Sequence, residues 1–370
     1  VQKGTFRATT DFSVVADLDA LSICVPTPLN KLKDPDVSFI LSVLDDVKQH
    51  LHSSFLVVLE STTYPGTTRE MVLPALQSTG LKAGRDFFLC FSPERIDPGN
   101  STYSVQNTPK VIGGITPNCT RAGRKLYETI ITEMIPVSSP EAAEMTKLLE
   151  NTFRSINIGL VNEMALMAEK LNVDIWEILD AAATKPFGFK KFTPGPGLGG
   201  HCIPIDPHYL AWKMKSLDYR ARFIELAGEI NTQMPHHVAN LVFRGLNTQG
   251  KPLSGSRVLI MGVAYKKDID DVRESPALDV MKLLEASGAL VDYYDSFVPK
   301  LKWDPEDKQS LSSVTADRVA EYDVIVITTD HSTVDYEFIR SSARLIIDTR
   351  NVFPRNGDRH IIRLGAGRVT

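Results

Sequence analysis

The opening part of the chain alternates short apolar runs with a helical pattern. The runs ALSICV, FLVVL and FFLCF, at residues 20–25, 55–59 and 87–91, have the length and apolar content of buried strands. Apolar residues recur with helical spacing over residues 37–50, between the first two runs. Apolar strands separated by helices are typical of a parallel sheet that is covered on both faces. Residues 1–135 are therefore expected to form an α/β domain.

A long helical region follows. Residues 140–171 contain one glycine and no proline after Pro140, and their apolar side chains fall on one helix face. Ser139 and Pro140 suit the N-cap and the first position of that helix. Further helical patterns cover residues 175–183, 208–217 and 221–246. We therefore expect residues 136–247 to be an all-helical block, and its long helix is a candidate dimer interface.

The α/β pattern restarts in the last part of the chain. Strands are predicted at residues 257–263, 289–295, 322–329 and 344–349, with a helix at 275–287. Residues 248–370 should form a second parallel sheet, Rossmann-like in rhythm. A dinucleotide pyrophosphate needs close backbone approach at several glycines, and only Gly262 stands at such a position. This domain therefore suits a mononucleotide diphosphate better than a dinucleotide.

Composition excludes several classes of protein. The 370 residues carry 41 basic and 45 acidic side chains, a net charge of −4, which argues against a nucleic-acid binder that relies on a positive field. We find no apolar run long enough for a membrane span. The four cysteines are widely spaced without a CxxC pair, which argues against a disulfide framework and against a zinc site. A cytoplasmic protein with no metal is the expectation.

The segment GPGLGGHCIPIDP, residues 195–207, is the most unusual in the chain. Its glycines allow close backbone approach to a ligand, and Cys202 follows them directly. Either Cys202 is a nucleophile or it stands by chance in a turn. The neighbouring His201 is a weak candidate for its base, because adjacent side chains seldom point at each other. Two other cysteines, Cys24 and Cys90, lie in apolar runs and are expected in the core, whereas Cys119 is expected to be exposed.

Three polar residues outside this segment are further candidates. Lys147 and Asn151 are four residues apart on the long helix and share a face, which suits oxyanion stabilisation or simply a solvated surface. Glu94 follows a predicted strand and is either a base or a surface carboxylate.

Basic residues also follow two predicted strands of the last domain. They are Lys266, Lys267 and Arg273 after one strand, and Arg350 after another. This placement suits a phosphate, unless these residues pair with the acidic side chains of the segment 268–274.

Taken together, the motifs resemble those of the UDP-glucose/GDP-mannose dehydrogenase family. VPTP, STTYPG, SPERIDPG, K-x3-N, GPGLGGHCIPIDP, AYKKDIDDVRESP and DTRN occur in the family's order over nearly the whole chain. The form GPGLGGHCIPIDPHYL is most similar to the UDP-N-acetylglucosamine 6-dehydrogenase branch. The family fold is α/β, with two Rossmann-like parallel-sheet domains joined by a central all-helical block.

The resemblance implies that two NAD⁺ are reduced while a UDP-sugar C6 alcohol becomes a carboxylate. Cys202 would attack the C6 aldehyde, and a second hydride transfer would leave a thioester for water to hydrolyse. Lys147 and Asn151 would stabilise the oxyanions, and Asp206 would orient Lys147 or a water. Glu94 would assist hydrolysis, with Thr62 holding a water.

The resemblance also implies binding residues, by motif position. Substrate contacts would be Arg95, Thr193, Leu198, Gly199, Tyr265, Lys266 and Arg350. Positions that face NAD would be Val25, Thr27, Ser61, Thr62 and Arg273. A homodimer or higher homo-oligomer through the central helices is the expected assembly, without a nucleic-acid or membrane partner.

The sequence departs from the family in one way. The glycine-rich loop that precedes VPTP in the family is absent, and the chain opens at Val1 rather than Met. The first domain is therefore expected to be incomplete, with its N-terminal strands absent, which could leave the chain inactive. The alternative substrates are UDP-N-acetylmannosamine, UDP-N-acetylgalactosamine and UDP-glucose. The alternative function is a non-catalytic nucleotide-sugar-binding module.

Overall fold

The computed structural model describes residues 6–30, 34–97, 100, 102–353 and 357–367. The chain divides into two compact units, which we call unit 1 and unit 2. Unit 1 comprises residues 1–152 and 205–221, and unit 2 comprises residues 153–204 and 222–370. The end of SPERIDPG, Pro98 and Gly99, lies outside the described residues, as does Val1.

Unit 1 contains a sheet of five strands, in the order β1-β2-β3-β4-β5. The strands are β1 (Ala20–Ile23), β2 (Leu56–Leu59), β3 (Phe88–Phe91), β4 (Lys110–Gly114) and β5 (Met134–Pro136). The first three pair in parallel, as their apolar runs predict. Strand β4 runs antiparallel to β3, so its first residue, Lys110, lies at the edge where β1, β2 and β3 end. The apolar pattern did not indicate β4 or β5.

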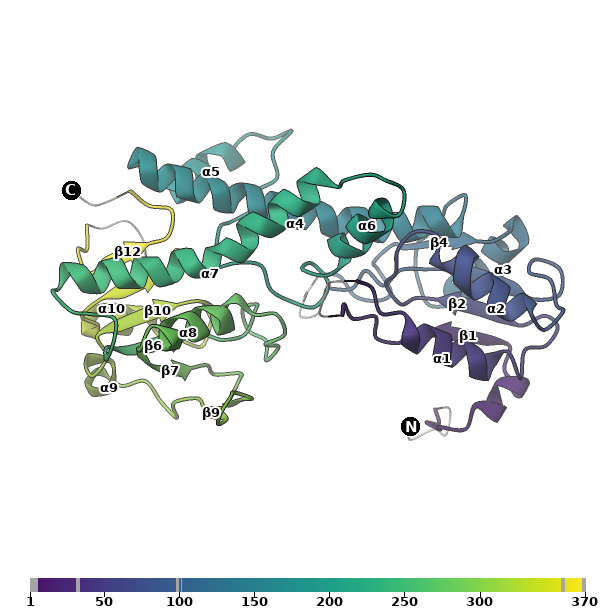
Figure 1. Ribbon diagram of the computed structural model, residues 1–370. Coiled ribbons are helices and arrows are strands. Elements are labelled where there is room, and N and C mark those ends of the chain that lie inside the picture. The colour runs from purple at the N-terminus through teal and green to yellow at the C-terminus, as the bar shows by residue number, and fades with distance from the viewer. Residues whose placement is uncertain (1–5, 31–33, 98–99, 101, 354–356, 368–370) are drawn as a thin grey trace. The chain divides into compact units, whose positions relative to one another are not determined.

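Helices cover both faces of this sheet (Figure 1). They are the 3₁₀-helix η1 (Phe12–Asp17), α1 (Ser38–Val47), the π-helical turn η2 (Thr68–Val72), α2 (Leu73–Gln77) and α3 (Pro117–Tyr127). Helix α6 (Asp206–Lys215) packs instead through Tyr209 on Tyr64 and Leu148. Side chains of β2 alternate between the two faces, as a strand requires. Val58 packs towards α3, and Val57 packs towards α1 and α2.

The sheet of unit 2 is parallel throughout, in the order β12-β11-β10-β6-β7. Its strands are β6 (Arg257–Met261), β7 (Leu290–Tyr294), β10 (Val324–Ile327), β11 (Ile346–Asp348) and β12 (Ile361–Arg363). One face packs on α7 (Arg222–Thr248) and α8 (Pro276–Ala286), and the other on α9 (Ala316–Ala320) and α10 (Tyr336–Ser342). A short antiparallel pair, β8 (Lys300–Leu301) and β9 (Lys308–Gln309), lies outside this sheet.

The longest helix is α4, Pro140–Leu171, and the division between the units falls within it. It begins as its sequence predicts, because the Ser139 hydroxyl accepts from the Ala142 N–H at 3.2 Å. Beyond the division, α4 packs with α5 (Ile175–Ala183) through Ala165, Ile175 and Trp176. No described helix is both long enough and apolar enough to span a membrane.

Two predictions about cysteines were wrong. Cys24 is exposed, because it stands one residue past the end of β1. Cys119 is buried, because it lies in the first turn of α3 and faces the sheet. Cys90 is buried on β3, as expected.

Leu148, on α4, tests the packing of unit 1. It is fully buried against Tyr64 and Tyr209. We expect Leu148→Ala to lower the free energy of unfolding by about 2–5 kcal/mol, because it leaves a cavity. The neighbouring Leu149 is 59% exposed, so Leu149→Ala should change stability by no more than about 0.5 kcal/mol. Urea unfolding followed by circular dichroism measures both, and equal losses would contradict the packing described.

Candidate active site

Unit 1 brings one group of the sequence-predicted residues together, and unit 2 another. Unit 1 holds Val25, Thr27, Ser61, Thr62, Glu94, Arg95, Lys147, Asn151 and Asp206. Unit 2 holds Thr193, Leu198, Gly199, Cys202, Tyr265, Lys266, Arg273 and Arg350.

In unit 1, α4 connects two of these residues to distant loops. The Lys147 ammonium donates to the Glu94 carbonyl oxygen at 2.6 Å. One turn later the Asn151 amide donates to the Asp206 carboxylate at 2.5 Å. Because Lys147 and Asn151 are four residues apart, they lie on one helix face, as predicted.

Asp206 is the most unusual carboxyl group of this set. It is 3% exposed and stands in the first turn of α6. Burial raises its pKa to about 6, while the charge of Lys147 and the hydrogen bond from Asn151 act in the opposite direction. The Lys147 ammonium and the Asn151 amide thus favour the charged form that burial disfavours, and the position of Asp206 in the first turn of α6 acts in the same direction.

Glu94 and Arg95 are held by local contacts. The Glu94 side chain is exposed and accepts from the N–H groups of Arg95 and Ile96, at 2.7 and 2.6 Å. Arg95 donates to Glu150 of α4 and to the Pro109 carbonyl, both at 2.6 Å. The loop after β3 is thus tied to α4 on two sides, by Lys147 and by Glu150.

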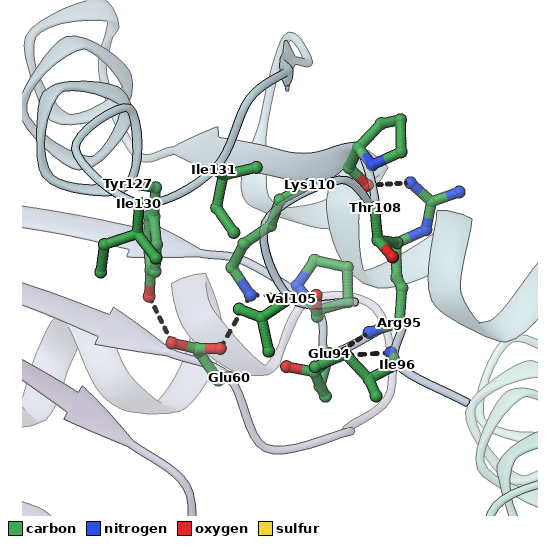
Figure 2. Close-up of a pocket in the computed structure, with 12 residues that line it drawn as sticks. Glu60, Glu94, Arg95, Ile96, Val105, Thr108, Lys110, Tyr127, Ile130 and Ile131 are labelled. Carbon is green, nitrogen blue, oxygen red and sulfur yellow. Dashed lines mark hydrogen bonds and ion pairs between the residues drawn. The ribbon is translucent and has the colours of Figure 1, made fainter. Parts of the chain in front are cut away.

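A pocket of about 170 Å³ opens beside this loop (Figure 2). Figure 2 shows the Lys110 ammonium and the Tyr127 hydroxyl both directed at the Glu60 carboxylate. Lys110 and Glu60 form a buried ion pair at 2.8 Å, which keeps the pKa of Glu60 low despite burial. The sequence motifs did not single out these three residues. Lys110 reaches Glu60 only because β4 runs antiparallel to β3, and the sequence pattern did not indicate this direction.

Four residues of unit 1 are those that the motifs predict to face NAD. Val25 and Thr27 follow β1, and Ser61 and Thr62 follow β2, so all four lie at the carboxyl edge of the sheet, where ligands bind in such folds. Ser61 donates to the Val25 carbonyl at 2.8 Å, which joins the two loops. Hydroxyl groups and a small apolar side chain at this edge are compatible with a bound dinucleotide.

The pyrophosphate end of NAD needs N–H groups at a helix N-terminus. The first α-helix after β1 is α1, which starts 15 residues beyond Ile23 at Ser38 and has no side-chain cap. Among the described residues of unit 1, Val25, Thr27, Ser61 and Thr62 therefore fit the cofactor, but β1 is not followed by a tight glycine turn into a helix.

In unit 2, the glycines of the loop 195–200 allow a close approach to two predicted substrate contacts. A Cβ on Gly195 would lie 2.8 Å from the Arg350 guanidinium, and one on Gly199 would lie 2.7 Å from Tyr265. Gly200 has φ +91°, a conformation that L side chains rarely adopt. The buried amide of Asn162 accepts from the Gly195 N–H at 2.9 Å. The loop before Cys202 is therefore held tightly.

Cys202 is exposed, as a nucleophile requires. Arg273 donates to Asp271 at 2.6 Å, and this hydrogen bond raises the pKa of its guanidinium. Partial burial, and after it the Arg273 charge, lower the pKa of His201.

The other predicted residues of unit 2 surround the carboxyl edge of its sheet. Tyr265 and Lys266 follow β6, and Arg350 follows β11, where its Nε donates to the Thr328 carbonyl at 2.7 Å. A pocket of about 260 Å³ at this edge is lined by Lys267, Asp330, His331, Ser332, Val334, Tyr336, Arg350, Asn351 and Val352. Of the remaining candidates, Thr193 is exposed and Leu198 is half-buried. In the described part of the chain, no three His, Cys, Asp or Glu side chains gather closely enough to hold a metal ion.

Asp206→Asn tests the buried charge through the pH dependence of stability. Because the folded-state pKa lies near 6, above the ordinary 3.8, the folded protein binds this proton more tightly, and stability falls as pH rises between these values. We expect the difference in unfolding free energy, variant minus wild type, to grow by roughly 2–3 kcal/mol between pH 4 and pH 7. Asp36, whose pKa is lowered by Ser38, is the control, since Asp36→Asn should change the difference in the opposite direction. A flat difference for Asp206→Asn would contradict the assignment.

Comparisons with known proteins identify the family of the chain. The models of the UDP-glucose/GDP-mannose dehydrogenase family match residues 1–131 (NAD binding domain), 141–233 (central domain) and 259–355 (UDP binding domain). The prediction that the first domain is incomplete is therefore not borne out, since the NAD-binding model matches from residue 1. These matches confirm NAD as the cofactor and support a UDP-sugar as substrate.

Relatives and solved structures match most of the chain. A UDP-N-acetyl-D-mannosamine dehydrogenase of Pyrococcus horikoshii is 37% identical over 89% of this chain and 77% of its own. A UDP-N-acetyl-D-glucosamine 6-dehydrogenase of Pseudomonas aeruginosa is 32% identical over 90% and 80%. The solved structure of a UDP-D-ManNAc dehydrogenase from Pyrococcus horikoshii has a TM-score of 0.88 and 33% identity, over 98% of this chain and 85% of that one.

Another solved structure, an NDP-N-acetyl-D-galactosaminuronic acid dehydrogenase from Methanosarcina mazei, has a TM-score of 0.84. It is 30% identical and covers 99% of this chain and 81% of its own. Together with the three family models, these relatives confirm the resemblance that the motifs carry. The chain belongs to the UDP-glucose/GDP-mannose dehydrogenase family and is an NAD-dependent UDP-sugar dehydrogenase.

Proposed function

We propose that this protein oxidises the C6 alcohol of a UDP-N-acetylhexosamine to the carboxylate, with Cys202 as the covalent nucleophile. One observation carries the proposal: Cys202 is an exposed thiol directly after a glycine loop that contacts Arg350 and Tyr265. A guanidinium and an aromatic side chain at the carboxyl edge of a parallel sheet suit a nucleoside diphosphate.

Two oxidations of one carbon explain why a thiol is needed. The first removes a hydride and a proton from C6–OH and gives an aldehyde. The Cys202 thiolate then forms an S–C bond to the aldehyde carbon. The aldehyde oxygen takes up the negative charge, which gives the oxyanion of a thiohemiacetal. Loss of a second hydride gives a thioester, and water cleaves the S–C bond to give the carboxylate and the thiol. Bound NAD⁺ supplies the chemistry of accepting one hydride in each oxidation.

Lys147 and Asn151 are the proposed oxyanion stabilisers. An ammonium and a carboxamide donate hydrogen bonds to a developing negative charge, and both side chains already have a fixed orientation through Glu94 and Asp206. Asp206 is proposed to orient them, since its charge interacts with Lys147 and its oxygen accepts from Asn151.

Hydrolysis of the thioester needs a base for water. Glu94 is the proposed base, because its carboxyl group is exposed at the end of β3. Thr62, half-buried after β2, is proposed to hold the water. Binding of the UDP-sugar is assigned to Arg95, Thr193, Leu198, Gly199, Tyr265, Lys266 and Arg350, and contact with NAD to Val25, Thr27, Ser61 and Arg273. Arg95 already pairs with Glu150, so we expect its contact with a sugar to involve exchange of this partner.

The names of the relatives support an N-acetylated sugar. The mannosamine, glucosamine and galactosaminuronic acid relatives all carry the N-acetyl group in their printed names. The motif form favours the glucosamine epimer, whereas the first relative above, at 37% identity, is a mannosamine enzyme. We propose UDP-N-acetylglucosamine as substrate, with the mannosamine epimer as the alternative.

Cys202→Ser tests the covalent step. Wild-type protein should form two NADH per sugar with one of four substrates, namely the UDP-linked N-acetyl sugars glucosamine, mannosamine and galactosamine, and UDP-glucose. The variant should form no uronate, because an alcohol cannot replace the thiolate, and should still bind UDP in a calorimetric titration. Uronate formation by the variant would contradict the nucleophile assignment. UDP-sugar binding without NAD binding by the wild type would support the non-catalytic module instead.

We also propose that residues 1–135, 136–247 and 248–370 act as cofactor, helical and UDP-binding parts, and that the chain forms a homodimer through the helical part. The face of α4 beyond residue 152 carries a row of exposed apolar side chains at helical spacing: Phe153, Leu160, Met164, Met167 and Leu171. A contiguous apolar face of this kind is typical of a protein interface.

Leu160→Lys tests the proposed dimer. Leu160 is 52% exposed in the middle of this row, and a buried unpaired ammonium there should dissociate the dimer. Light scattering after size exclusion should show half the mass of the wild type. Leu290, 59% exposed on β7, is the matched control, and Leu290→Lys should leave the mass unchanged. A monomeric wild type, or a variant of unchanged mass, would contradict the interface.

A further inference from the structure

The loop that carries Ser61 and Thr62 is fixed by a residue that none of the motifs identifies. Glu144 of α4 is 1% exposed and accepts three hydrogen bonds from this loop. The Gly66 N–H donates to one carboxylate oxygen at 2.6 Å. The N–H and the hydroxyl of Thr68 donate to the other oxygen, at 2.9 and 2.7 Å.

The position of Glu144 on the helix relates this loop to the proposed chemistry. Lys147 is three residues after Glu144 and Asn151 is seven after it, so all three share one face of α4. Glu144 is also four residues before Leu148, which packs on Tyr64 of the same loop. The loop 61–68 therefore has a polar and an apolar connection to the helix face that carries Lys147.

The loop 61–68 needs these contacts with α4, because it contains a buried polar group that destabilises it. The Thr63 hydroxyl is buried and has no hydrogen-bond partner among the described residues. A buried hydroxyl without a partner is destabilising. Burial raises the pKa of Glu144 to about 7, while its three donors favour the charged form. The Thr63 hydroxyl and the Glu144 carboxyl group are both unfavourable to bury. Unfavourable groups of this kind persist where the surrounding structure holds a particular geometry.

We propose that Glu144 is a positioning residue, which sets where the loop of Ser61 and Thr62 lies relative to Lys147 and Asn151. This inference rests on the proposed function, because it concerns the position of residues to which that function assigns roles. It assigns Glu144 itself no contact with the substrate. Among the described residues, Glu144 accepts its hydrogen bonds from the loop 61–68 of its own unit. Its loss should therefore lower kcat and leave the KM for the UDP-sugar unchanged.

The test compares Glu144→Gln and Glu144→Ala with Glu141→Gln. Glu141 lies one turn earlier on α4 and pairs with Arg69 at the surface, at 2.5 Å, so it joins the same two elements without bonding to the loop 61–68. We expect kcat to fall roughly 100-fold for Glu144→Ala, as misplacement by about 1 Å does, and less for Glu144→Gln. Glu141→Gln should keep the wild-type kcat, since surface ion pairs contribute little.

Hydrogen–deuterium exchange adds a readout that does not depend on activity. Amides of the segment 61–68 should exchange faster in Glu144→Gln than in the wild type, while amides of α4 keep their protection. Unchanged exchange, an unchanged kcat, a raised KM alone, or an equal loss in Glu141→Gln would overturn the proposal. A wild type that oxidises none of the four UDP-sugars would refute the proposed function, and the exchange experiment would still decide the role of Glu144.

Discussion

The constraint on which unit 1 depends is the pairing of polar side chains along one face of α4. Glu144 and Asn151 are buried, so their carboxylate and amide groups are costly unless each finds a partner, and the half-buried Lys147 is paired beside them. Their partners lie in three different segments: the loop after β2, the loop after β3, and the start of α6. Since each group needs its partner, the three segments are fixed relative to one helix.

In unit 2 the constraint is steric rather than polar. The loop 195–200 passes so close to Arg350 and Tyr265 that a side chain at Gly195 or Gly199 would overlap them. Glycine gives up conformational entropy on folding, so its use here indicates that a close approach is needed. Asn162 completes the arrangement by accepting the Gly195 N–H. Cys202 lies two residues after this closely packed loop.

These constraints agree with the chemistry of a two-step oxidation. An aldehyde is reactive, and an enzyme that oxidises it further benefits from holding it covalently. Oxyanion stabilisation works best when the donors are oriented before the charge develops. The buried Asp206 carboxylate, with its raised pKa, has an unfavourable environment for stability and a favourable one for orienting Asn151. A buried group that lowers stability but orients a neighbouring side chain is expected at a functional site.

The sequence alone determined the features that depend on neighbouring residues. Apolar runs located β1, β2 and β3, helical spacing located α4, and four-residue spacing placed Lys147 and Asn151 on one face. The motifs identified the family, and the glycines singled out Cys202. The tertiary structure decided what depends on the path of the chain. Strand β4 runs antiparallel to β3, so that Lys110 pairs with Glu60, which is 50 residues away in the sequence. The fold also brings Glu144 within hydrogen-bond distance of Thr68, which is 76 residues away in the sequence. Periodicity and motifs act over a few residues, whereas these hydrogen bonds form only when the fold brings distant segments together.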